Sequence, residues 1–335
     1  MSRVFRILGA GEWGLAIANH LALQDNDVEV YIRNPKVVSE LQSKNIYNGL
    51  NHKLNEKIRY YQLDVIAGIS KKDNAINILA PSSDGFSEIV DNYAEYLSLY
   101  NEIVWLTKGL DHSSGSLFHN IIDNKIPTNI DKCIISGPSF ARDLLNKKSI
   151  TVTAASTSTD LFDLLADSMN TNYFKLLFTN NIVGVEISGI IKNISGILAG
   201  ALTANGFSDE YIDELIRLSQ VEVLSITEKI IEKNKEYAIG DDDPNDLLVS
   251  PACYGDMHLT CFYNTSRNRQ LGLKLKGDFN TKKIMSGIGT VEGYLSTSTL
   301  FFNNEKFNIG KVVLSAYSIL YQKKNIENVL DNLFK

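Results

Sequence analysis

The sequence predicts an α/β fold in which a doubly wound, mostly parallel sheet over residues 1–182 is followed by an all-helical domain over residues 183–335. In the first half, short apolar and β-branched runs alternate with segments of helical periodicity, a pattern typical of parallel sheets with helical crossovers. After about residue 182 the strand-like runs disappear and helical periodicity continues alone. The length of 335 residues fits two domains of ordinary size.

Apolar runs bounded by polar or turn-forming residues predict strands that are buried on both faces. These runs are Val4–Leu8, Val28–Ile32, Ala75–Leu79, Ile103–Leu106 and Cys133–Ile135, and a second group of strands is expected to continue through Ile150–Ala154. Helical spacing between them predicts helices over Trp13–Leu23, Pro35–Lys44 and Phe86–Leu99. Because the strands alternate with helices, we expect parallel pairing through right-handed crossovers.

The second half shows helical periodicity over Val183–Ala204, Asp209–Lys233, Thr290–Phe302 and Gly310–Leu320. The whole chain has six prolines and no low-complexity linker, so we expect a continuous junction between the domains.

Composition excludes several classes of partner. The net charge of −6 gives no electrostatic footprint for nucleic acid or an anionic membrane surface. We expect no integral membrane segment, because no run is predicted to approach the roughly 18 apolar residues of a membrane span. Cys133, Cys253 and Cys261 are scattered and form no CxxC pair, which argues against a zinc or redox site and predicts a reducing, cytoplasmic setting without a bound metal.

The segment from Gly9 to Gly14 reads Gly-Ala-Gly-Glu-Trp-Gly and lies directly between the first strand and the first helix. In that position Gly9 permits a tight turn, Gly11 lets the backbone approach a pyrophosphate, and Gly14 lets helix and strand pack closely. The helix N-terminus then presents unpaired amides to the phosphates. The segment therefore predicts a Rossmann-type dinucleotide site, the alternative being a glycine turn in an unrelated α/β protein.

The end of the second strand carries Arg33 where an acidic residue that binds the ribose is typical. An arginine there can stack on adenine or pair with a 2′-phosphate, so NADP is tolerated as well as NAD, unless Arg33 is simply a solvated charge. Glu12 suits the first helical turn but would repel a diphosphate, so we expect it to point aside or to contact a ribose.

Three further features suggest a site for an anionic substrate. Lys108 closes an apolar strand, which places it to meet an anion, although a surface lysine is the common alternative. Lys192 occupies an otherwise apolar helix, where an unpaired ammonium is costly, so either its stem reaches water or a site lowers its pKa for proton transfer. Asp256, Thr260 and the segment 266–269 add a carboxylate, a hydroxyl and a guanidinium suited to phosphate, or else form a loop and a solvated patch.

Taken together, these residues resemble the bacterial form of the NAD(P)-dependent sn-glycerol-3-phosphate dehydrogenase family. The matching pieces run in family order from residue 9 to residue 293. They are the glycine turn with Trp13, Arg33, Lys108-Gly109, Gly137-Pro138-Ser139-Phe140-Ala141, Glu186 leading to Lys192-Asn193, Gly255-Asp256 with Thr260-Cys261, Ser266-Arg267-Asn268-Arg269, and Glu292-Gly293.

The resemblance implies reversible hydride transfer between NAD(P)H and dihydroxyacetone phosphate or sn-glycerol 3-phosphate, which would supply glycerol 3-phosphate for phospholipid synthesis. It implies that Lys192 gives and takes the proton, that Asp256 orients it, and that Asn193 and Thr260 assist. The substrate-binding residues it implies are Lys108, Gly137, Ser139, Ser266, Arg267 and Asn268. The implied cofactor-binding residues are Gly9, Gly11, Glu12, Trp13, Gly14, Arg33, Lys108, Ala141, Arg267 and Glu292. It also implies a homodimer.

The sequence departs from the family pattern at several positions. Residues 210–214 stand where an Asn-Ala/Thr-Arg/Lys motif is usual, Asp143 replaces a glutamate, Tyr263 replaces a small hydroxyl residue, and residues 45–49 keep little of a tyrosine-leucine-proline-glycine segment. Two alternatives therefore stay open: a paralogous dehydrogenase of another phosphorylated or anionic hydroxy compound, and a catalytically silent nucleotide-binding protein.

Overall fold

The computed structural model describes residues 3–47, 49–70, 74–127, 129–234, 237, 243–277 and 279–335. Its contacts divide the chain into two compact units. The first comprises Met1–Asp111 and Ser116–Ile182, and the second comprises His112–Gly115 and Val183–Lys335. The short segment His112–Gly115 therefore belongs to the second unit, although both of its neighbours in sequence belong to the first. Each unit is described by itself.

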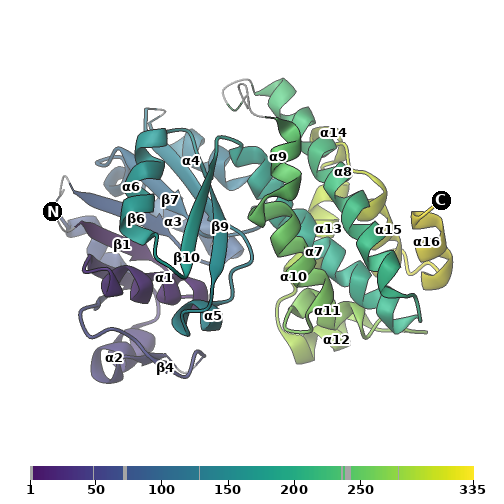
Figure 1. Cartoon of the computed structure of the whole chain (residues 1–335), viewed down its shortest axis with the longest axis horizontal. Coiled ribbons are helices and arrows are strands. Elements are labelled where there is room, and N and C mark those ends of the chain that lie inside the picture. Colours follow the sequence, from purple (N-terminus) through teal and green to yellow (C-terminus); the bar gives the residue numbers. More distant parts are fainter. Residues whose placement is uncertain are drawn as a thin grey trace. The chain divides into compact units, whose positions relative to one another are not determined.

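The first unit is built on one eight-stranded sheet with the strand order β10-β9-β8-β7-β6-β1-β2-β5 (Figure 1). The strands are β1 (Val4–Leu8), β2 (Asp27–Ile32), β5 (Arg59–Gln62), β6 (Ala75–Leu79), β7 (Glu102–Trp105), β8 (Asp131–Ser136), β9 (Ile150–Ser156) and β10 (Phe174–Thr179). Strand β1 pairs in parallel with both β2 and β6, so the strand order reverses between β1 and β6. Ligands of open α/β sheets bind beyond the carboxyl ends of the strands at such a reversal.

The sheet confirms the mostly parallel fold, with one departure from purely parallel pairing. Strand β9 runs antiparallel to β8, and β10 then pairs in parallel with β9. Sequence analysis missed the edge strands β5 and β10. Strand β5 is short and has charged and polar ends, whereas β10 reads Phe-Lys-Leu-Leu-Phe-Thr, an apolar run that sequence analysis left unassigned. It also missed the two-residue strands β3 (Ile46–Tyr47) and β4 (His52–Lys53), which pair antiparallel outside the main sheet.

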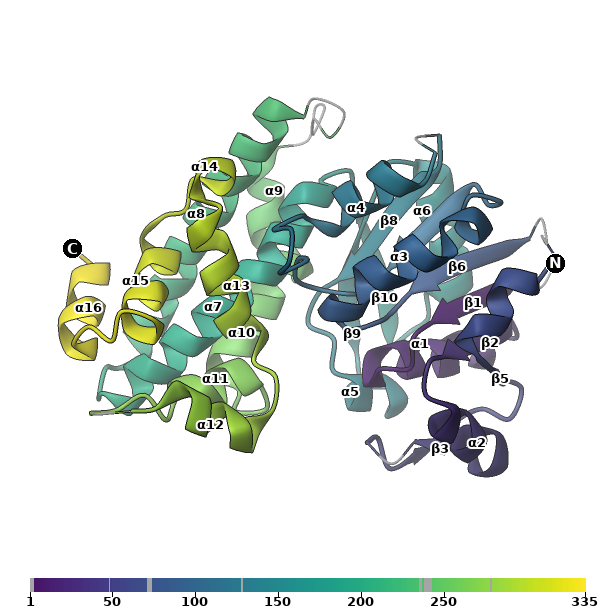
Figure 2. The same cartoon turned by 180° about the vertical axis from the view of Figure 1, so that it is seen from behind.

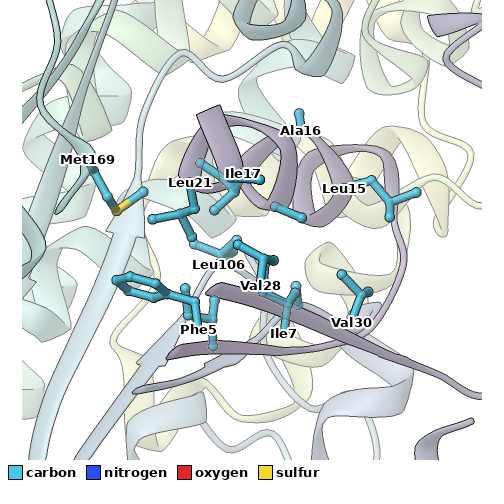
Figure 3. Packing of buried hydrophobic residues seen from close by; sticks show 14 of the residues in the cluster. Phe5, Ile7, Leu15, Ala16, Ile17, Leu21, Val28, Val30, Leu106 and Met169 are labelled. Atoms are coloured by element: carbon cyan, nitrogen blue, oxygen red, sulfur yellow. The ribbon is translucent and has the colours of Figure 1, made fainter. Parts of the chain in front are cut away.

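Helices cover both faces of this sheet, as Figures 1 and 2 show from opposite sides. They are α1 (Glu12–Leu23), α2 (Pro35–Lys44), the 3₁₀ helix η1 (Leu63–Gly68), α3 (Ser83–Leu97), α4 (Phe118–Lys125), α5 (Ala141–Leu145) and α6 (Thr159–Met169). Figure 3 shows Leu15, Ile17 and Leu21 of α1 packed over apolar side chains of β1 and β2. This apolar layer fixes the start of α1, and with it the glycine turn.

The described part of the second unit contains helices and no strand, as expected. They are α7 (Ile182–Ala204), α8 (Asp209–Lys233), α9 (Pro244–Val249), the π-helical turn η3 (Pro251–Gly255), α10 (Asp256–Phe262), α11 (Arg267–Gly272), α12 (Thr281–Ile288), α13 (Glu292–Phe302), α14 (Asn304–Phe307), α15 (Lys311–Leu320) and α16 (Ile326–Leu333). Helix α11 lies very close to α7, since a Cβ on Gly272 would stand 2.0 Å from the carbonyl oxygen of Ile197. This close approach places the start of α11 beside Asn193.

Helix α7 corrects one statement made from the sequence. Its 23 residues are long and apolar enough to cross a membrane by length and composition. However, 94% of its most apolar window is buried inside the protein, as in the core helix of a globular domain. The apolar character of α7 is therefore explained by packing within the helical unit.

Candidate active site

The glycine turn of the first unit follows β1 at the point where the strand order reverses. Gly9 has φ +122°, and a Cβ there would stand 2.4 Å from the carbonyl oxygen of Ala80, so both its conformation and its surroundings require glycine. Gly11 is the N-cap of α1 and makes no side-chain cap bond. Gly14 is buried beside Ala80. The first amides of α1 thus lie beside the open end of the sheet, where they suit an anion.

A cavity of about 490 Å³ opens at this turn. Gly9 and Gly11 line it together with Pro81 and Ser82 after β6 and Arg33 after β2. These residues come from the carboxyl ends of three neighbouring strands, which is where a doubly wound sheet binds a dinucleotide. The position of the cavity and the residues that line it suit the adenosine and phosphate portions of such a cofactor.

Two carboxylates that sequence analysis missed give the cavity an acidic character. Asp64 and Glu88 both line the cavity, and the Arg33 Nη1 atom lies 2.9 Å from Glu88 Oε2. Burial, together with the charges of Asp64 and Glu88, raises the pKa of Tyr93, which also lines the cavity. Arg33 is the single cation among the described residues lining the cavity, so its charge is already opposed before any ligand binds.

Glu12 and Trp13 lie beside the turn but do not line this cavity. Glu12 is exposed, and its Oε1 atom lies 3.0 Å from the position of a Cβ on Gly49, so the carboxylate points toward that loop. The half-buried Trp13 packs against the apolar core of the first unit.

The ends of β7 and β8 are joined through a lysine. The Lys108 Nζ atom donates hydrogen bonds to the carbonyl oxygen of Gly137 at 2.8 Å and to Ser139 Oγ at 3.1 Å. Ala141 follows as the first, buried residue of α5. The structure therefore brings together three residues from two sequence motifs and places a half-buried ammonium beside a hydroxyl at the same edge of the sheet.

In the second unit, Lys192 and Asp256 form a buried ion pair with 2.9 Å between Nζ and Oδ1. The side chains are 13% and 3% exposed, respectively. Thr260 stands one turn after Asp256 on α10 and donates its hydroxyl to the Asp256 carbonyl oxygen at 2.7 Å. A buried pair of this kind contributes little stability relative to an apolar pair, so folding alone does not require it, and the pair is a candidate for proton transfer.

A second set of hydrogen bonds begins next to this lysine. Asn268 Nδ2 donates to Asn193 Oδ1 at 2.8 Å, and Asn268 Oδ1 accepts the backbone N–H of Gly293 at 2.9 Å. These bonds join α7, α11 and the first turn of α13, where Glu292 lies. The side chain of Glu292 is 21% exposed.

The two arginines of the segment 266–269 have different surroundings. Arg269 is buried and donates to Asn264 Oδ1, Thr203 Oγ1 and the carbonyl oxygen of Cys261, which are bonds that hold the fold together. Arg267 is exposed at the start of α11, directly after the half-exposed Ser266. Of these two guanidinium groups, Arg267 is the one placed to meet a ligand.

The cysteines near Asp256 are not candidates for nucleophilic catalysis. Burial raises the pKa of Cys253 to about 11 and that of Cys261 to about 12. Both groups stay neutral thiols near pH 7, and a thiol is a much weaker nucleophile than a thiolate. Among these neighbouring groups, the Lys192–Asp256 pair is therefore the candidate for proton chemistry.

Curated relatives match the chain over nearly its whole length. A glycerol-3-phosphate dehydrogenase [NAD(P)+] of Francisella tularensis subsp. novicida is 28% identical over 341 aligned residues, covering 99% of this chain and 97% of that protein. The enzyme of the same name from Thioalkalivibrio sulfidiphilus is 27% identical over 86% of this chain and 83% of that protein.

Solved structures share the fold. Glycerol-3-phosphate dehydrogenase from Coxiella burnetii superposes with a TM-score of 0.85 at 24% identity, covering 100% of this chain and 99% of that one. The enzyme from Saccharomyces cerevisiae gives a TM-score of 0.81 at 15% identity over both whole chains.

Family models match both halves of the chain in order. The N-terminal model of NAD-dependent glycerol-3-phosphate dehydrogenase matches residues 5–162, and the C-terminal model of the same enzyme matches residues 181–331. The cofactor class follows from the first match, since that model describes an NAD-dependent N-terminus. With the glycine turn and the lysine–aspartate pair in the matched regions, the chain belongs to the NAD-dependent glycerol-3-phosphate dehydrogenase family.

Proposed function

We propose that this chain catalyses the reversible reduction of dihydroxyacetone phosphate to sn-glycerol 3-phosphate with NADH or NADPH. The observation that carries the proposal is the buried Lys192–Asp256 ion pair in a chain that also has a dinucleotide-binding turn. Names of relatives that match nearly the whole chain support the same reaction. The product would serve phospholipid synthesis.

The first unit would hold the cofactor. The amides at the start of α1 would bind its pyrophosphate, with Gly9, Gly11 and Gly14 shaping the turn, and Arg33 would meet the adenosine end. Trp13, Ala141, Glu292, Lys108 and Arg267 would complete the contacts. When bound, the nicotinamide supplies or accepts the hydride.

Lys192 would handle the proton at the substrate's C2 oxygen. As a C–H bond forms at C2, the π electrons of the carbonyl move to oxygen, and the ammonium stabilises the developing negative charge before giving its proton. Asp256 holds the amine at 2.9 Å, which fixes its position. In the reverse direction, the neutral amine takes the proton back from the hydroxyl.

The remaining residues would position the substrate. Arg267 and Asn268, together with Ser266, would bind the phosphate, and a guanidinium suits that group because it can donate two parallel hydrogen bonds. Lys108, Gly137 and Ser139 form a hydrogen-bonded cluster in the first unit that would hold the glycerol portion. Asn193 and Thr260 would support the region around Lys192.

The direct test follows the absorbance of reduced nicotinamide when purified protein is mixed with dihydroxyacetone phosphate. Loss of absorbance with NADH or NADPH supports the proposal. Turnover on another anionic ketone but not on this one would assign a paralogous dehydrogenase instead. Cofactor binding by calorimetry with no turnover on any ketone would identify a silent nucleotide-binding protein.

Replacing Arg267 tests the phosphate role separately. In Arg267→Ala we expect the KM for dihydroxyacetone phosphate to rise about tenfold or more, because the lost bonds act on ground and transition states alike, while kcat changes less. Lys274→Ala removes another exposed cation just after α11 and is the matched control. An unchanged KM in Arg267→Ala would remove this residue from the phosphate site.

We also propose a homodimer in the cytoplasm. The family resemblance supports the dimer, and the free, buried cysteines 133, 253 and 261 suit a reducing compartment. Light scattering after size-exclusion chromatography would decide the first point, with a mass near 37.3 kDa contradicting it. Cell fractionation would decide the second.

A further inference from the structure

His112 makes two side-chain contacts within the second unit. Its Nε2 atom lies 2.9 Å from Glu292 Oε1, and its Nδ1 atom lies 3.1 Å from Thr299 Oγ1. The histidine side chain is 15% exposed, so both contacts are largely shielded from water. The ring is thus held between the first and second turns of α13.

The segment that carries His112 is anchored at its other end as well. The Lys306 Nζ atom donates to the carbonyl oxygen of Gly115 at 2.9 Å. All four residues of His112–Gly115 belong to the helical unit by their contacts. The ring is therefore attached to a fixed backbone, which is what a side chain needs in order to position another.

Hydrogen-bond chemistry assigns the direction of the main contact. An ionised carboxylate can only accept, so the His112 Nε2–H donates to Glu292. The Thr299 hydroxyl also lies 3.1 Å from the carbonyl oxygen of Leu295, and it can bond the ring at Nδ1 in either proton arrangement. One side of the Glu292 carboxylate is consequently fixed by a donor.

Glu292 is connected to the candidate catalytic region through its own backbone. Its neighbour Gly293 donates to Asn268, and Asn268 donates to Asn193, which follows Lys192. The carboxylate is therefore fixed at its backbone by one hydrogen-bond chain and at its oxygen by His112. A group held in two ways loses little further freedom when it binds a ligand.

We propose that His112 is a positioning residue that orients the Glu292 carboxylate toward a hydrogen-bond donor of the bound dinucleotide. The proposal rests on the proposed function, because it takes from it that Glu292 meets the cofactor. His112 itself touches Glu292 and Thr299 and contributes to cofactor affinity through them.

A set of variants separates positioning from a merely structural role. His112→Phe keeps an aromatic ring but loses both hydrogen bonds, and we expect the Kd for NADH to rise about tenfold, the scale of one lost bond to a charged group. His112→Gln should recover most of the affinity, because its amide can donate at a reach similar to Nε2. His52→Phe, a half-buried histidine in the first unit, is the matched control and should leave NADH affinity unchanged.

A double-mutant cycle tests the link to Glu292. If His112 acts through that carboxylate, His112→Phe should weaken NADH binding much less in a Glu292→Gln background than in the wild type. Additive effects would overturn the proposal, as would an NADH Kd within twofold of wild type in a folded His112→Phe variant. Failure of Gln to recover affinity while the variant stays folded would also overturn it.

The readout keeps this proposal separate from the reaction itself. Binding of NADH is followed by calorimetry or tryptophan fluorescence, without any substrate. A protein that binds NADH but reduces no dihydroxyacetone phosphate would contradict the proposed function and still allow the His112 series to be measured.

Discussion

Each unit carries candidate site residues of its own, and the two sets are of different kinds. In the sheet unit the set centres on backbone at the glycine turn after β1, with side chains such as Arg33 and Lys108 around it. In the helical unit it consists of side chains from α7, α10, α11 and α13, joined by hydrogen bonds such as Lys192–Asp256 and Asn193–Asn268. A binding site made of backbone is specified locally, whereas a site made of side chains depends on helices that are distant in sequence.

Each unit also buries an ion pair, and the two pairs differ in their exposure and in their hydrogen-bond partners. In the sheet unit Arg6 and Glu29 lie 2.9 Å apart, Tyr31 donates to Glu29, and Arg6 donates to Tyr96. Burial alone would lower the pKa of Arg6, but hydrogen bonds to Tyr96 and Glu29 outweigh it and raise that pKa above its ordinary value. Lys192 by contrast keeps 13% of its side chain exposed, against 1% for Arg6.

The largest expected effect tests whether the Arg6 pair is structural. In Glu29→Gln we expect the free energy of unfolding to fall by about 3–5 kcal/mol, because a guanidinium is left buried without its counter-charge. Denaturant unfolding measures this. Glu56→Gln, which breaks the exposed pair with Lys53, is the control and should change little. Equal effects in the two variants would contradict the structural interpretation of Arg6–Glu29.

A smaller effect tests whether the backbone of the glycine turn shapes the cofactor site. Gly9→Ala should weaken NADH binding about tenfold or more, since its φ of +122° and the 2.4 Å approach to Ala80 force the turn to move. Gly68→Ala is the control, because a Cβ there would meet nothing within 4 Å. Calorimetric titration with NADH compares the two. If both variants bind alike, the turn does not shape the cofactor site.

The smallest effect concerns Glu88, one of the two carboxylates that line the cavity. Glu88→Gln frees Arg33 from its ion pair and removes a negative charge, so the ratio of NADPH to NADH affinity should rise several-fold. The pair is exposed and screened, which limits the change. Calorimetric titration with each cofactor gives the ratio, and Glu40→Gln, on the exposed surface of α2, serves as control. A constant ratio would show that Glu88 does not compete for Arg33.

The same contrast explains what could be predicted from the sequence. The glycine turn and the five main strands were predictable, because buried strands are continuous apolar runs and the turn has a fixed local spacing. The strand at Ile150–Ala154 was expected as well, but its antiparallel direction was not predictable, since the direction of a strand is decided by its connection and not by its composition. Strand β5 reads Arg-Tyr-Tyr-Gln and gives no apolar signal at all.

In the helical unit, Lys192 and Asp256 were proposed as site residues because a lysine stands in an apolar helix and because the motifs resemble a family. Their contact joins positions 64 residues apart, and no local pattern encodes such a distance. Asp64, Glu88 and His112 were missed for the same reason. A histidine in a polar loop carried no signal, and its role as a partner of Glu292 appears only when residues 180 apart are brought together.

The central claim is that the helical unit performs the proton chemistry while the sheet unit binds the dinucleotide, and replacing Lys192 tests it most directly. In Lys192→Ala we predict that kcat falls by about 10²-fold or more, the usual scale for a lost acid–base group, while the Kd for NADH stays within about twofold of wild type. A variant that keeps near-normal kcat would contradict the account, and so would one that loses NADH binding and catalysis in equal measure.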